Sequence, residues 1–275
     1  MPNKSLEDLL ALAGGARVYD LGVDLYPGVP HFPTHPPFVF GLTKRHGEVT
    51  TELADGRIAS SSADAIATGT HVGTHIDGLG HFSCNGRLFG GAPTSGQSYE
   101  KGLPVHGLET VAPISRRGVL LDVARLEGVR SLPKDFSIGP KHLEEACRRQ
   151  KIEIRPGDVV LLRTGWAQYW PDPAMYVTAG KGNAPTGPGP EIDAARWLSA
   201  RGIFATGSDT LAYEKVPSAM PVHVHLLVER GIHLIEVLDL ERIAADGIFE
   251  FLFVALPLKI RGATGSPVRP IALAV

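Results

Sequence analysis

Residues 71–81 constrain the fold of this chain more than any other stretch, because they read His-Val-Gly-Thr-His-Ile-Asp-Gly-Leu-Gly-His. On a helix, His71 and His75 would share a face, but Gly73 and the β-branched residues around it disfavour a helix. On a straight strand, His71 and His75 would lie about 13 Å apart. The sequence therefore predicts a strand that is broken or bulged near Gly73, with His81 on the loop that follows.

Three imidazoles and one carboxylate in so short a window suggest a metal site. Imidazole nitrogens and carboxylate oxygens are ligands that Zn²⁺ and Mn²⁺ take from proteins, so we expect His71, His75 and Asp77 to converge on one divalent cation. His81 lies further along the loop, and the pKa range of imidazole suits proton transfer. We therefore predict that His81 is a general acid/base, and that Thr74 hydrogen-bonds Asp77 or a bound water.

The same residues resemble the signature of the cyclase family of metal-dependent hydrolases (kynurenine formamidase- and isatin hydrolase-like), His-x-Gly-Thr-His-x-Asp-x-Pro-x-His. The chain differs at Leu79, where the family has proline, and matches at His71, Gly73, Thr74, His75, Asp77 and His81. The resemblance implies an α/β fold with a central mixed, β-barrel-like sheet flanked by helices, and a Zn²⁺ or Mn²⁺ ion. It also implies His81 as the proton carrier.

The resemblance further implies metal ligands far along the chain. In the family, a histidine stands three positions before a Leu-Leu pair, and an acid or amide follows about a dozen residues later. His223 and Glu236 fit this spacing, although His225 stays an alternative to His223. If both distal groups join, Asp77 bridges two ions, and otherwise the site holds one.

Composition excludes several classes of protein. The chain has 275 residues, 43% of them hydrophobic, and a formal net charge of −2, so nothing favours nucleic acid or a membrane surface. No apolar run approaches the roughly 20 residues of a membrane span. With two cysteines, no implied disulfide framework and no recognisable signal peptide, the cytoplasm is the expected compartment.

The hydrophobic pattern predicts one α/β domain over residues 1–275, with strands alternating with a few helices. The expected helices are residues 4–14, 138–150 and 191–200. The expected strands are residues 17–21, 38–43, 57–65, 118–123, 158–164, 203–207, 232–237 and 247–256, before an apolar tail at 271–275. The proline-rich segment 25–37 is predicted to be an N-terminal arm on a partner subunit or one wall of a pocket, and residues 180–190 a flap or turn.

These features together predict a metal-dependent amidohydrolase. A metal-activated water would attack an N-formyl aryl amine or a cyclic amide, with His81 moving the proton. A metal-dependent lyase or cyclase acting on a small carbonyl substrate is the alternative, and a non-catalytic metal-binding module is a third. Phe32, Phe82 and Trp166 are candidates for contact with a small-molecule substrate, and we expect a homodimer or homotetramer.

Overall fold

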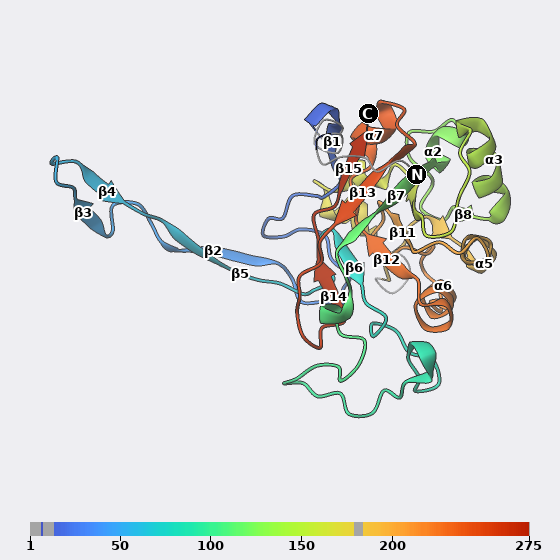
Figure 1. Ribbon diagram of the computed structural model, residues 1–275, viewed down its shortest axis with the longest axis horizontal. Helices are drawn as coiled ribbons and strands as arrows, with labels where there is room; N and C mark the ends of the chain where they lie inside the picture. Colours follow the sequence, from blue (N-terminus) through green and yellow to red (C-terminus); the bar gives the residue numbers. More distant parts are fainter. Residues whose placement is uncertain (1–6, 8–13, 179–183, 275) are drawn as a thin grey trace.

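The computed structural model describes Glu7, residues 14–178 and residues 184–274. Its main element is a curled, mixed sheet of nine strands (Figure 1). In spatial order the strands are β1 (Arg17–Asp20), β15 (Ile271–Ala274), β13 (Glu250–Ala255), β7 (Ile114–Asp122), β9 (Val159–Arg163), β11 (Ala205–Ser208), β12 (His233–Glu236), β6 (His75–Asp77) and β14 (Gly265–Pro267). Strands β7, β9, β11 and β12 run parallel, and the strands on either side of them pair antiparallel.

The parallel centre follows from composition. All five residues of β9 are buried, as expected for an apolar strand that is covered on both faces. Helices cover one face, where Leu143 of α3 (Pro140–Gln150) and Leu198 of α5 (Ile192–Ser199) pack against Leu121 and Leu162 of the sheet (Figure 1). A second core on the other face is built around Leu120, Leu161 and Phe253, with Ile243 of α7 (Glu241–Ala245) among them.

The remaining elements are short. The helices are α2 (Val123–Leu126), α3 (Pro140–Gln150), α4 (Pro173–Val177), α5 (Ile192–Ser199), α6 (Pro221–His223) and α7 (Glu241–Ala245), with the 3-10 turns η1 (Phe89–Gly91), η2 (Leu108–Thr110) and η3 (Trp166–Tyr169) and the π-helix η5 (Val224–Arg230). A small parallel pair joins β8 (Ser137–Ile138) to β10 (Gly189–Pro190). Within the described residues, no helix has the length and apolar character needed to cross a membrane.

A two-stranded arm projects from the body (Figure 1). It contains β2 (Val39–Lys44) paired with β5 (Ala63–Ala67), and β3 (Thr50–Glu52) paired with β4 (Ile58–Ser60). The strand pair predicted at residues 38–43 and 57–65 is present in part, because the second segment divides into β4 and β5 and only β5 pairs with β2. An arm was one of the two roles predicted for the proline-rich segment 25–37. The structure instead forms the arm from the stretch that follows this segment. Phe40 and Ile66 are paired across the two strands of the arm, and both side chains are exposed. The homo-oligomer expected from the sequence stays a prediction.

Most predicted elements of the body are present, with ends that differ by one to four residues. β1, β7, β9, β11, β12, β13, α3 and α5 occupy the predicted segments, and the apolar tail forms β15. The helix predicted at residues 4–14 falls almost wholly outside the described residues, as does the first part of the segment 180–190. The predicted break at Gly73 is also present, because β6 begins only at His75 and Gly73 has a φ of 68°.

Buried Asp209 connects the ends of two parallel strands. It follows β11, and its carboxylate accepts hydrogen bonds from the backbone N–H groups of Thr164, Gly165 and Trp166 and from the Thr164 hydroxyl, all just after β9. Burial raises the pKa of Asp209 to about 6, against the opposing effect of these hydrogen bonds. Removing the carboxylate leaves several buried donors without an acceptor.

Asp209→Ala is therefore expected to lower the free energy of unfolding by about 3 kcal/mol, since each unsatisfied buried donor costs about 1–3 kcal/mol before relaxation. Urea denaturation monitored by circular dichroism measures this. Asp135→Ala, at an exposed position, is the control and should change stability by less than about 0.5 kcal/mol. Equal stability of the two variants would show that the Asp209 carboxylate does not fix this turn.

Candidate metal centre

Two neighbouring strands bring the first ligand-type side chains together. In the antiparallel pair β6–β12, His75 stands directly opposite Glu236, and Asp77 lies two positions along β6 on the same face. His75 Nε2 lies 3.4 Å from Glu236 Oε2 and 3.6 Å from Asp77 Oδ1. All three side chains are buried. The intervening Ile76 points into the core on the other side of the sheet.

His71 reaches the same carboxylate from the turn before β6. Its Nδ1 lies 2.7 Å from Asp77 Oδ1, and its Nε2 lies 2.9 Å from the hydroxyl of Thr264. The ring occupies space that Gly265 of β14 leaves open, since a Cβ at Gly265 would come within 2.4 Å of His71 Cε1. The fold therefore contains a specific cradle for the His71 imidazole.

We expect Gly265→Ala to displace His71 and to lower the free energy of unfolding by about 1–3 kcal/mol, the usual cost of overpacking a filled site. Chemical denaturation provides the measurement. Gly41→Ala is a suitable control, because a Cβ there meets no atom within 4 Å. If Gly265→Ala were as stable as the wild type, the cradle would not constrain the ring.

His223 supplies a fifth ligand-type side chain, from the end of α6. Its Nε2 lies 3.3 Å from Glu236 Oε1 and 3.9 Å from Asp77 Oδ2. His225, the alternative, is directed elsewhere: its Nδ1 lies 2.7 Å from Glu229 and its Nε2 lies 2.9 Å from the Ser199 hydroxyl. The π-helix η5 that begins at Val224 carries His225 away from the cluster.

Both His75 and His223 present Nε2 to the cluster because their Nδ1 atoms have other partners. His75 Nδ1 lies 2.8 Å from the Gly73 carbonyl, to which it can donate, and His223 Nδ1 lies 2.8 Å from Glu214. Burial opposes protonation of His223, but the Glu214 and Glu236 carboxylates outweigh burial and raise its pKa to about 10. The His223 ring therefore carries a proton on both nitrogens at neutral pH, and a cation that binds at Nε2 would have to displace the proton there.

The charge of the cluster fits a divalent cation. The buried carboxylates of Asp77 and Glu236 face imidazoles, and within the described residues neither forms an ion pair with lysine or arginine. Asp77 Oδ2 is buried and has no hydrogen-bond partner among the described side chains and backbone groups. Burying an acceptor without a partner costs free energy of folding. The neighbouring imidazole nitrogens and carboxylate oxygens are metal ligands, so a cation bound among them would be the missing partner of Asp77 Oδ2.

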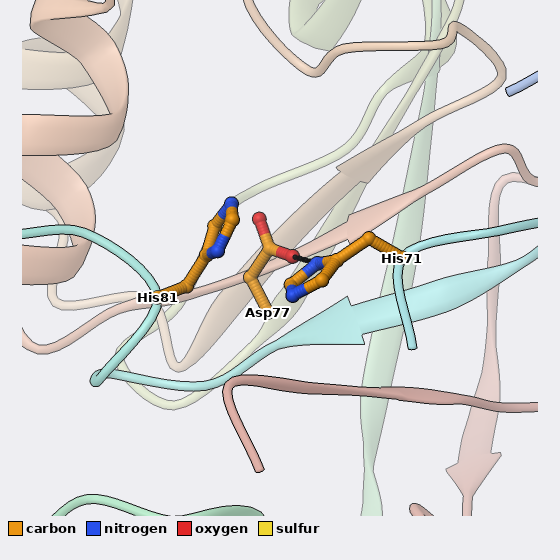
Figure 2. A group of neighbouring side chains, drawn as sticks. All are labelled: His71, Asp77 and His81. Atoms are coloured by element: carbon orange, nitrogen blue, oxygen red, sulfur yellow. Dashed lines mark hydrogen bonds and ion pairs between the residues drawn. The ribbon is translucent and has the colours of Figure 1, made fainter. Parts of the chain in front are cut away.

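His81 lies closer to these groups than its place in the sequence indicated. A turn in which His81 N–H donates to the Gly78 carbonyl, at 3.0 Å, folds the chain back. The His81 ring stacks on His71 with centroids 4.0 Å apart, and the two rings flank Asp77 (Figure 2). Although His81 lies further along the loop, donor atoms of His71, Asp77 and His81 lie within 4.8 Å of one another, so His81 is within reach of a shared cation.

The electrostatics of His81 nevertheless suit a proton acceptor. Burial lowers the pKa of its imidazole to about 4, against the attraction of the Asp77 carboxylate. Burial also opposes ionisation of Asp77, but the nearby His81 and His71 imidazoles reverse this effect, so the pKa of Asp77 lies below its ordinary value. At neutral pH the His81 imidazole is therefore neutral and lies next to anionic Asp77, which is the protonation state in which a general base must begin.

Comparison with known proteins identifies the family. The sequence model of the Cyclase family matches residues 19–215. The chain belongs to the Cyclase family. An isatin hydrolase of Roseibium aggregatum is 26% identical over 272 residues, which cover 95% of this chain and 93% of the relative. A kynurenine formamidase of Bacillus thuringiensis subsp. konkukian is 30% identical over 215 residues, which cover 77% of this chain and 80% of the relative. A crystal structure of a novel cyclase has a TM-score of 0.84 and 28% identity, and covers 99% of this chain and 91% of its own.

These matches confirm the family and the mixed sheet with helices outside it that the sequence predicted. In this Cyclase-family protein, His71, His81, His223 and Glu236 open onto a cavity of about 230 Å³. Its apolar wall includes Phe32 and Phe82, two of the predicted substrate contacts, together with Leu211 and Met220. The proline-rich segment 25–37 therefore forms a wall of this cavity, which was the second of its two predicted roles.

Two predicted roles do not agree with the structure of this Cyclase-family protein. Trp166 does not line the cavity but belongs to the apolar cluster behind its wall, which also includes Leu211, and its indole N–H donates to the Tyr176 carbonyl. The Thr74 hydroxyl does not reach Asp77 but donates to the Val237 carbonyl at 2.5 Å and accepts from Val23 N–H. Thr74 therefore connects β6 to the neighbouring chain segments rather than orienting the site.

Sequence reasoning also missed two neighbours of the site. His35 lines the cavity, with its ring centroid 5.2 Å from that of His71, and burial lowers its pKa. A histidine flanked by prolines in a segment predicted to be a pocket wall was the signal for it. Thr264, which contacts His71 Nε2, gave no signal, because a threonine far along the chain carries no ligand pattern.

Proposed function

We propose that the protein is a metal-dependent hydrolase that cleaves the amide bond of an N-formyl aryl amine or a small cyclic amide. The observation that carries the proposal is the buried Asp77 Oδ2, which has no hydrogen-bond partner in the described part of the chain and lies beside imidazoles that line a small cavity. The relatives named isatin hydrolase and kynurenine formamidase support the substrate class. A coordinating ion is Zn²⁺ or Mn²⁺ on the basis of these donor types.

The residues have distinct roles in this proposal. His75, Asp77, His223 and Glu236 would hold a cation, with His71 beside them on Asp77. A bound cation would act as a Lewis acid, polarising a carbonyl and lowering the pKa of water. If His223 and Glu236 bind a second ion, Asp77 is the group that both ions share.

His81 is the proposed general acid/base. Its neutral imidazole lines the cavity next to Asp77, where it can accept a proton from the attacking water at a ring nitrogen. The same nitrogen then donates the proton to the leaving amine. The attraction of Asp77 for the imidazolium stabilises the protonated form that exists between these two transfers.

The cavity restricts the size of the substrate. A volume of about 230 Å³ suits one aromatic ring with a small substituent, since a protein cavity of about 150 Å³ accommodates benzene. Phe32 and Phe82 offer ring faces or edges against which an aryl group can pack. The polar side of the cavity, formed by His71, His81 and Glu236, would then receive the amide.

The test is a screen of the metal-loaded enzyme with N-formylkynurenine, isatin and simple lactams in water enriched in ¹⁸O. A hydrolase incorporates one solvent oxygen into the carboxylate product. Turnover without solvent oxygen in the product would instead support a metal-dependent lyase or cyclase. Metal binding with no turnover of any amide would contradict the proposed hydrolase.

A further inference from the structure

Glu214 is a buried carboxylate directly behind the cluster. Its Oε1 lies 2.8 Å from His223 Nδ1 and accepts the His223 backbone N–H at 3.1 Å. Its Oε2 accepts from Val222 N–H at 3.3 Å and from the Ser218 hydroxyl at 3.1 Å. The residue is only 1% exposed.

We propose that Glu214 is a positioning residue for the metal centre: it fixes His223 with Nδ1 protonated and so directs the free Nε2 towards Asp77 and Glu236. This inference rests on the proposed metal-dependent function and adds a residue to it. A histidine that binds a metal through one nitrogen commonly donates from the other to a carboxylate, which sets the tautomer and increases the basicity of the ligand.

The geometry favours this role over simple capping of α6. A neutral acceptor would satisfy two backbone N–H groups, and burying a carboxylate for that purpose alone is costly. The negative charge of Glu214 acts on its third partner, the His223 ring. The Nε2 atom of this ring faces the carboxylates of Asp77 and Glu236. The adjacent residue acts in the same direction, because Tyr213 N–H donates to Glu236 Oε1 at 2.7 Å. Tyr213 and Glu214 thus orient both distal donors.

The chain contains a matched control for this arrangement. His225 Nδ1 lies 2.7 Å from Glu229, much as His223 Nδ1 lies from Glu214, but His225 Nε2 faces Ser199 instead of the cluster. Glu229→Gln therefore removes a carboxylate from a histidine–glutamate pair of similar length without touching the proposed site, although Glu229 is exposed and Glu214 is buried. Glu214→Gln keeps the size of the side chain and one oxygen, which can still accept His223 N–H, while its amide NH₂ group takes the position of the oxygen that accepts Val222 N–H.

The experiment titrates metal-free full-length protein with Zn²⁺ and with Mn²⁺ by calorimetry. Glu214→Gln is expected to weaken metal binding roughly 10- to 100-fold, the usual effect of removing a carboxylate behind a histidine ligand. Glu229→Gln should bind as the wild type does. Thermal melting in chelator shows whether each metal-free variant is folded, and both are expected to melt within a few degrees of the wild type.

A second readout follows the His223 ring itself. In ¹⁵N NMR spectra of the zinc-loaded wild type, His223 is expected to carry its proton on Nδ1, and that proton should shift upfield in Glu214→Gln but not in Glu229→Gln. Wild-type affinity in Glu214→Gln, equal losses in the two variants, or an Nε2-protonated His223 would each overturn the proposal. Failure of the wild type to bind either metal would overturn both this proposal and the proposed function. Metal binding without amide hydrolysis would contradict only the function.

Discussion

Asp77→Asn is expected to abolish metal binding in the micromolar range and to eliminate activity. Asp77 contacts or approaches His71, His75 and His223, and within the described residues it is common to both groups of candidate metal ligands. Removing a residue that hydrogen-bonds a metal ligand weakens metal affinity roughly 10- to 100-fold. Removing Asp77, which is itself a proposed ligand, should weaken metal affinity by more than this. The asparagine side chain keeps the size and one oxygen, so the packing of β6 is preserved.

Stability provides a readout of this variant that needs no substrate. Metal at about 100 times its dissociation constant should stabilise the wild type by about 2.7 kcal/mol, which corresponds to roughly 5–10 °C in melting temperature for a chain of this size. Asp77→Asn should show no such shift, whereas Asp135→Asn, at an exposed position, should show all of it. An unchanged metal-induced shift in Asp77→Asn would remove Asp77 from the site.

His81→Gln is expected to retain the metal and to lose about 10²- to 10⁴-fold in kcat, the range that a general acid/base usually contributes. Glutamine is polar and of similar reach, but it cannot exchange a proton near neutral pH. Neutral His81 lines the cavity beside Asp77, so its loss should affect turnover far more than substrate binding. Steady-state kinetics and metal analysis of the same preparation measure the two effects.

The alternative for His81 is direct coordination, which the closeness of His71, Asp77 and His81 makes geometrically possible. In that case the variant would lose metal in proportion to activity. His46→Gln, on the exposed arm, controls for the general effect of replacing a histidine and should retain both metal and rate. Full metal content with wild-type kcat in His81→Gln would remove His81 from the mechanism.

The sheet was predictable because its strands have simple patterns. The buried runs at β7 and β9 can be covered on both faces only at the centre of a sheet, and alternation of Phe249, Phe251 and Phe253 indicated β13. What the pattern could not provide was the pairing order of the nine strands. The arm also escaped prediction in its extent, because nothing in residues 39–67 distinguishes a projecting ribbon from a strand pair within the body.

The spacing of residues 71–81 was enough to predict the first part of the candidate site, His71, His75 and Asp77. Gly73 and the β-branched residues around it excluded a helix, which correctly indicated a broken strand and a turn before His75. His223 and Glu236 came from a family pattern, and the structure places them at the cluster. Glu214 escaped notice because its role depends on a hydrogen bond to a residue nine positions later, and Trp166 was misassigned because aromatic composition does not reveal which side of a core a ring faces.

Anomalous X-ray diffraction from crystals grown with Zn²⁺ or Mn²⁺ tests the central claim most directly. Data recorded on either side of the absorption edge of the metal locate the ion independently of activity. The account predicts a strong anomalous peak within coordination distance, about 2.0–2.2 Å, of the Asp77 carboxylate, with at least two of the surrounding imidazoles as ligands. A peak elsewhere, or no peak in protein that retains its fold, would contradict it.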